Sequence, residues 1–169
     1  MKSKDIITII ELICIILILT IGIIVFFLNN RKKITEIKKF EFTYSSGSEI
    51  YAYVEYKIDC TNKCVASIKP TGVPENNARK VKIEKEKVKE LEDILRKYKV
   101  EKWDGFQKYN KHILDGSSFI MHIYMEDNTT IGASGYMKFP NNFAEVSKEL
   151  GNYFKEIYDS GTDNGIERI

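Results

Sequence analysis

A chain of 169 residues with a formal net charge of +2 has room for one domain of ordinary size and a short appendage. The excess positive charge lies at the start, because residues 1–33 carry five basic and two acidic side chains and leave 21 basic and 22 acidic ones for the remainder. Nucleic-acid-binding domains present a basic face, so a nearly neutral remainder argues against that class.

The segment Ile6–Leu28 is almost wholly apolar, and Glu11 is its one charged residue. A helix of this length reaches roughly 35 Å at about 1.5 Å per residue, enough to cross a hydrocarbon core of about 30 Å. No small-residue cleavage site follows it. The sequence therefore predicts a single-pass protein of the cell membrane, with a flank over 1–5 and one transmembrane helix over 6–28. Glu11 then either contacts a partner helix or reaches the interface.

Cys60 and Cys64 flank a short loop between two alternating segments, so a hairpin would bring them opposite each other. Facing residues of antiparallel strands have Cα atoms about 4.5–5.5 Å apart, a separation that a disulfide tolerates. A disulfide, two buried free thiols and, least favoured, a pair of metal ligands stay open; no metal site is predicted. A disulfide would favour an extracytoplasmic domain, whereas the basic residues of the charged connector 29–39 favour a cytoplasmic one. The side is left open.

Alternating apolar residues predict strands over 40–45, 49–59, 64–69 and 79–84, and a strand pair over 119–125 and 129–135. Three- and four-residue spacing predicts amphipathic helices over 85–99 and 143–157, the second capped by Asn141 and Asn142. The fold class expected is α+β: an antiparallel sheet with two helices on one face, over 40–158, preceded by the transmembrane helix. Residues 159–169 are expected to be disordered.

Three short motifs contain the candidate binding residues: "WDGF" from Trp103, "LDGSSF" from Leu114, and "ASGYMKFPNNF" from Ala133. As a set they resemble an uncharacterised bacterial domain family, a domain of unknown function with W-x-G-F, L-D-G-x-x-F and A-S-G…P-x-N-F motifs. The resemblance covers most of 40–157 and implies a domain boundary but no activity. The favoured interpretation is structural: the motifs form a strand end, turns and a helix cap packed under aromatic side chains. The alternative is that they gather at one sheet edge as a binding surface of Trp103, Asp104, Gly105, Phe106, Asp115, Gly116, Ser134, Gly135, Asn141 and Asn142.

Catalytic signals are weak. The phosphate-binding loop and the dinucleotide fingerprint are absent, and His112 and His122 are the only imidazoles. Asp115, His122 and Ser134 can be drawn as a triad, although triads are recognised by geometry rather than by sequence. The function favoured is a membrane-anchored, non-catalytic module that binds a protein partner or an envelope component, without cofactor or nucleic acid. The alternatives are a small hydrolase-like enzyme using Asp115, His122 and Ser134, and an accessory or sensor subunit acting through the membrane helix.

Overall fold

The computed structural model describes residues 12–23, 32–47, 53–69, 78–113 and 115–161, which belong to two compact units, Met1–Lys32 and Lys33–Ile169. In the first unit a helix covers 12–23, and its apolar side chains are exposed. Twelve helical residues reach about 18 Å, and among the described residues no helix is long and apolar enough to cross a membrane. The predicted transmembrane helix over 6–28 is therefore wrong, and so are the single-pass and cell-membrane predictions made from it. Glu11, whose role depended on that helix, lies outside the described residues.

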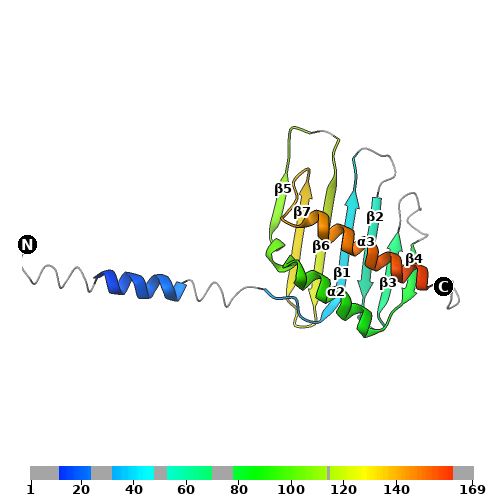
Figure 1. Cartoon of the computed structure of the whole chain (residues 1–169), viewed down its shortest axis with the longest axis horizontal. Helices are drawn as coiled ribbons and strands as arrows, with labels where there is room; N and C mark the ends of the chain where they lie inside the picture. The colour runs from blue at the N-terminus through cyan, green and yellow to red at the C-terminus, as the bar shows by residue number, and fades with distance from the viewer. Residues whose placement is uncertain (1–11, 24–31, 48–52, 70–77, 114, 162–169) are drawn as a thin grey trace, which may run out of the picture. The chain divides into compact units, whose positions relative to one another are not determined.

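The second unit, which we call the domain, is built on a seven-stranded sheet with the order β4-β3-β2-β1-β6-β7-β5 (Figure 1). In chain order its strands are β1 (Ile37–Ser45), β2 (Tyr53–Asp59), β3 (Val65–Lys69), β4 (Arg79–Lys82), β5 (Phe106–Tyr109), β6 (Ser118–Met125) and β7 (Thr130–Tyr136). Neighbouring strands are antiparallel except β5 and β7, which are parallel. The α+β class is confirmed, but the sheet is mixed rather than antiparallel. The error comes from β5, whose four residues "FQKY" are too few to show a period of two.

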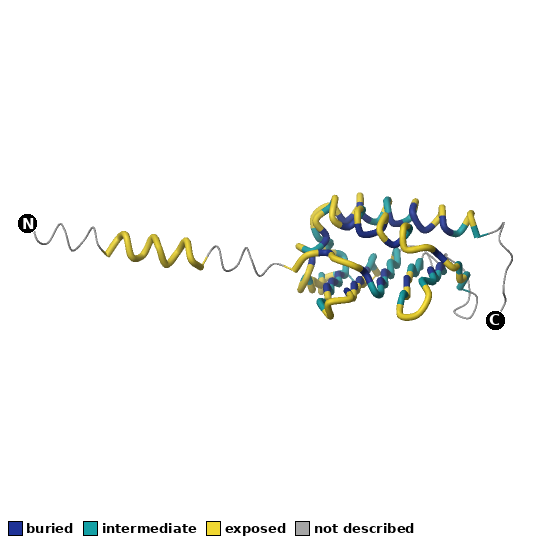
Figure 2. The backbone as a smooth tube through the Cα atoms, turned by 90° about the horizontal axis from the view of Figure 1, so that it is seen from below, coloured by how far each residue is buried: buried dark blue, intermediate teal, exposed yellow. Residues whose placement is uncertain are grey.

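Both long helices, α2 (Lys85–Lys97) and α3 (Phe143–Ser160), lie on the same face of the sheet (Figures 1 and 2). The core lies between them and the sheet, where Phe40 and Phe42 of β1 meet Leu91 of α2 and Phe154 of α3 as fully buried side chains. The phenol of Tyr153 joins the two helices by donating to the backbone oxygen of Lys87 at 2.6 Å, and burial raises its pKa. The expected disorder over 159–169 is wrong at its start, because α3 continues to Ser160; residues 162–169 lie outside the described part.

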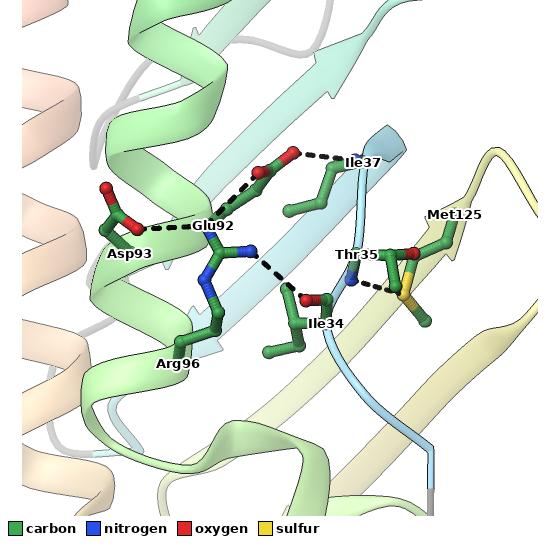
Figure 3. Close-up of polar contacts among 7 residues, drawn as sticks. All are labelled: Ile34, Thr35, Ile37, Glu92, Asp93, Arg96 and Met125. Carbon is green, nitrogen blue, oxygen red and sulfur yellow. Dashed lines mark hydrogen bonds and ion pairs between the residues drawn. The ribbon is translucent and has the colours of Figure 1, made fainter.

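The chain enters the sheet earlier than residue 40. Ile34 and Ile37 are buried, and the backbone N–H of Ile37 donates to the carboxylate of Glu92 at 2.9 Å (Figure 3). Arg96, one turn further along α2, donates to the backbone oxygen of Ile34 at 3.1 Å and is paired with both Glu92 and Asp93. These contacts fasten the segment before β1 to α2, so the last residues of the predicted connector 29–39 are part of the domain.

We expect Glu92→Ala to lower the free energy of unfolding by about 2 kcal/mol, because it leaves the buried N–H of Ile37 without an acceptor. The measurement is urea unfolding of the full chain. Asp93→Ala is the matched control, since it removes a 67 % exposed partner of the same arginine and should cost less than about 0.5 kcal/mol. If the two changes lowered the free energy of unfolding equally, the hydrogen bond from Ile37 to Glu92 would not be a particular source of stability.

Cys60 and Cys64 form a disulfide, which confirms the first of the three open states and removes the other two. Their Cα atoms are 4.0 Å apart at the end of the β2–β3 hairpin. The backbone N–H of Cys60 also donates to the carbonyl oxygen of Lys38 at 2.8 Å, so the bridge is fixed to β1. Disulfides persist where the surroundings are oxidising.

Candidate binding surface

Trp103 is a core residue, only 3 % exposed, at the end of the short 3-10 helix η2 (Val100–Trp103). Its indole N–H donates to the backbone oxygen of Asn141 at 3.1 Å, and its ring lies 6.2 Å from that of Phe119 and 6.0 Å from that of Phe143. The contacts hold the start of α3 against the sheet. They explain the tryptophan as part of the packing rather than as a ligand contact.

The next two motif residues attach β5 to β7 at a single residue, Gly132. The carboxylate of Asp104 accepts from the N–H of Gly132 at 3.1 Å, and the N–H of Gly105 donates to its carbonyl oxygen at 2.9 Å. Gly105 has φ 74°, a conformation that glycine adopts without steric cost. The Asp-Gly pair is thus the turn that starts the parallel strand at Phe106.

The other two motifs form the far ends of β6 and β7. A Cβ on Gly116 would overlap the side chain of Met137, and the N–H of Met137 donates to the carbonyl oxygen of Ser117 at 2.8 Å. Asn142 precedes α3 with φ 62° and makes no capping hydrogen bond through its side chain. The expected asparagine cap is therefore wrong, because a residue in the left-handed region does not have the extended backbone of an N-cap.

The candidate residues do gather around β5, β6 and β7, but on both faces of the sheet. Phe106 pairs with the buried Ala133 of β7 and Gly135 is itself buried, whereas Ser134 alternates to the opposite face. Asp115 is exposed. A single binding surface made of all ten residues does not exist in this arrangement.

The drawn triad is not assembled either. His122 faces Gly132 across the strand pair and Ser134 faces Ile120, so the two are diagonal neighbours on one face, with about 7–8 Å between such positions. β6 begins at Ser118, and Asp115 lies before that residue. His122 is four residues further along the strand, about 13 Å from Ser118. Asp115 therefore lies at the wrong end of the strand to orient the imidazole.

One surface stands out for a different reason: in the described domain, the sheet face opposite α2 and α3 is covered by no helix or strand (Figure 2). The large apolar side chains that are exposed in the described domain are Tyr109, Ile120 and Tyr124, at 61, 49 and 37 %. Ile120 and Tyr124 point to that face by the burial alternation of β6, and Tyr109 does so because it pairs with Tyr136, which follows the buried Gly135 of β7. Tyr109 also stacks on Tyr136 of β7 at 4.8 Å.

The uncovered face has two chemically different halves. The half over β5, β6 and β7, which we call the neutral half, contains no Lys, Arg, Asp or Glu among its described outward residues, in a chain that is 30 % charged. These residues are Gln107, Tyr109, Ser118, Ile120, His122, Tyr124, Thr130, Gly132, Ser134 and Tyr136. The half over β1 to β4, which we call the lysine half, carries three acidic side chains, Glu41, Glu55 and Asp59, and six lysines: Lys38, Lys39, Lys57, Lys69, Lys80 and Lys82.

Two shallow hollows border Lys39, one beside the β6–β7 turn and the other beside the β2–β3 hairpin. One, of about 400 Å³, is bordered by Lys38, Lys39 and Tyr124, and the other, of about 540 Å³, by Lys39, Asp59 and Lys63. A register shift between Ile37 and Lys39 gives β1 an irregularity at Lys38, and a bulge of this kind re-aims side chains. It explains why two consecutive lysines line one hollow.

Sequence reasoning missed Tyr109, Ile120 and Tyr124. For β6 a signal was present, because an isoleucine and a tyrosine occupy the outward, otherwise polar positions of a strand whose other side is fully apolar. Tyr109 had no such signal, since β5 itself was not predicted.

No protein-family model matches the chain, and no curated protein is significantly similar to it. The resemblance to an uncharacterised bacterial family stays a prediction that depends on the three motifs. The geometry of the sheet face is therefore the basis for a function.

Proposed function

We propose that this chain is a non-catalytic binding module that holds another protein against the uncovered face of its sheet. The observation that carries the proposal is that Tyr109, Ile120 and Tyr124, the exposed large apolar side chains of the described domain, all lie on that face. Scattered apolar residues on a surface need no explanation, whereas apolar residues gathered together mark interaction sites.

The composition of the neutral half supports the same proposal. The centres of protein interfaces are depleted in charged residues and enriched in aromatic ones. Tyrosine with serine and glycine is also the combination that antibody paratopes use, because tyrosine offers a large contact area with few rotatable bonds. The neutral half combines three tyrosines with two serines and one glycine. The Cys60–Cys64 bridge favours an oxidising compartment for the encounter.

The hydrolase-like alternative has less support, because Asp115, His122 and Ser134 are not brought together. Neither hollow is bordered by one of the three. The accessory-subunit alternative depended on a membrane helix, and it falls with that prediction.

A photo-crosslinking amino acid at position 120 of the full chain, in the cells that make it, tests the proposal. We expect a discrete adduct with a second polypeptide. Tyr109→Ser combined with Tyr124→Ser should lower its yield about tenfold, because buried aromatic anchors dominate interface energies. Both tyrosines are exposed, so the urea midpoint should stay unchanged.

The control places the same crosslinker at Lys155, an exposed position on α3 and so on the covered side of the sheet. Adducts of equal yield from positions 120 and 155, or a yield at 120 that ignores the two tyrosine changes, would overturn the proposal.

A further inference from the structure

We infer that the partner is a different protein, not a second copy of this chain, and that its surface is acidic where it meets the lysine half. The inference rests on the proposed function and adds the chemistry of the partner to it. Three observations support it: the size of the neutral half, the surplus of lysines beside it, and the residues that would face each other in a two-fold symmetric dimer of this chain.

The neutral half alone is too small for a stable complex. Strands β5, β6 and β7 have 4, 8 and 7 residues; at about 3.3 Å per residue and about 4.8 Å between strands they cover roughly 300 Å². A standard protein interface takes about 800 Å² from each partner. A partner seated on the exposed tyrosines must therefore extend beyond the neutral half, and the same sheet face continues beside β6 over β1 and β2, the lysine half.

The lysine half has an unmatched positive charge. Six lysines accompany three acidic side chains: Asp59 pairs with Lys39 at 3.1 Å, Glu55 pairs with Lys57, and Glu41 faces Lys57 across β1 and β2. The hydroxyl and amide of Thr61 hold the pKa of Asp59 below its usual value, so this carboxylate stays ionised beside its own lysine.

Further out, Lys80 and Lys82 on the edge strand β4 face Ser67 and Val65 across the strand pair. The surplus is local, because residues after Lys33 have nearly equal numbers of basic and acidic side chains. A partner that covers these lysines without offering carboxylates would leave them desolvated and unpaired, which is costly. The two hollows beside Lys39 leave room for side chains of the partner, and each is bordered by lysine together with one acidic residue, Glu41 or Asp59.

The two simplest face-to-face pairings with a second copy do not bring carboxylates over Lys80 and Lys82. In a face-to-face dimer with the two-fold axis along the strands, β4 of one copy lies over β5 of the other, so lysines meet uncharged side chains. With the axis across the strands and through the middle of β4, β4 lies over β4, and Lys80 and Lys82 meet the same lysines of the other copy. Like charges placed opposite each other across an interface cost several kcal/mol.

The experiment combines the crosslinker at position 120 with the charge reversal Lys80→Glu and Lys82→Glu in the full chain. We expect this charge reversal to lower the adduct yield at least about tenfold. In permeabilised cells the difference in yield between the reversed and the unchanged chain should shrink as ionic strength rises, because salt screens exposed charges. The matched control is Lys89→Glu with Lys155→Glu, two exposed lysines on α2 and α3, which should change the yield less than twofold.

The outcomes separate this inference from the proposed function. An adduct that depends on Tyr109 and Tyr124 but ignores the reversal of Lys80 and Lys82 overturns the inference and leaves the binding face intact. An adduct with the mass of two copies of this chain, or a crosslink within one copy, overturns it as well. Equal yields from positions 120 and 155 overturn the proposed function, and the inference with it.

Discussion

Replacing Phe154 with alanine should lower the free energy of unfolding by about 3–5 kcal/mol, a large part of the stability of a domain of this size. Phe154 is completely buried at the centre of α3. Its ring stacks on Tyr56 of β2 at 4.5 Å and on Phe40 of β1 at 6.1 Å, and it meets the ring of Tyr153 edge-on at 5.0 Å. Alanine would leave a cavity between a helix and two strands that are held by other contacts, so the surroundings cannot collapse to fill it.

The measurement is the urea unfolding curve of the full chain, with its slope as a check on two-state behaviour. Lys155→Ala is the matched control, because it changes the adjacent, exposed residue of the same helix and should stay within about 0.5 kcal/mol. A loss below about 1 kcal/mol for Phe154→Ala would mean that α3 does not pack on the sheet as described.

Phe154 also illustrates how far the sequence alone predicts this fold. Its helix was predicted from the spacing of Phe143, Val146 and Leu150, because an amphipathic period leaves a strong local signal. The strands around the core were predicted from a second local signal, the alternation of apolar and polar residues. The disulfide was among the open states because a short hairpin loop restricts where Cys60 and Cys64 can lie.

What the sequence did not predict depends on contacts that are not local. The edge strand β5 is attached to β7 because Asp104 and Gly105 hydrogen-bond the N–H and the carbonyl oxygen of Gly132. Asp104 and Gly132 are 28 residues apart in the sequence. The apolar run over 6–28 was predicted to span a membrane from composition and length, yet the helix described within it covers only 12–23.

The motif glycines follow the favoured structural interpretation, because a side chain or the backbone passes close to Gly116 and Gly135. Only the alternative, a binding surface made of the same motifs, was placed on the wrong part of the sheet. The sheet face bearing Ile120 and Tyr124 became visible only when the helices were placed on the opposite side.

Gly135→Ala is expected to destabilise the domain by about 3 kcal/mol, at the upper end of overpacking effects. A Cβ at Gly135 would lie 2.7 Å from the ring of Phe119 and would overlap the carbonyl oxygen of Lys138. The ring of Phe119 lies within contact of several others: 4.7 Å from Phe143, 5.8 Å from Phe139 and 6.2 Å from both Trp103 and Phe106. The added methyl group therefore displaces the centre of an aromatic cluster on one side and the backbone turn after β7 on the other.

Gly132→Ala separates this packing effect from a general cost of alanine in β7. A Cβ at Gly132 meets only Cδ2 of His122, at an ordinary 3.6 Å, and alanine keeps the N–H and carbonyl oxygen that Asp104 and Gly105 bind. Loss of glycine flexibility in the unfolded chain offsets small costs, so the urea midpoint should move little. If both alanine variants were equally destabilised, the close approach at Gly135 would not be the cause. If Gly135→Ala were neutral, "GASG" would be free surface, and the glycine would again be a candidate for binding a ligand rather than for the packing of Phe119.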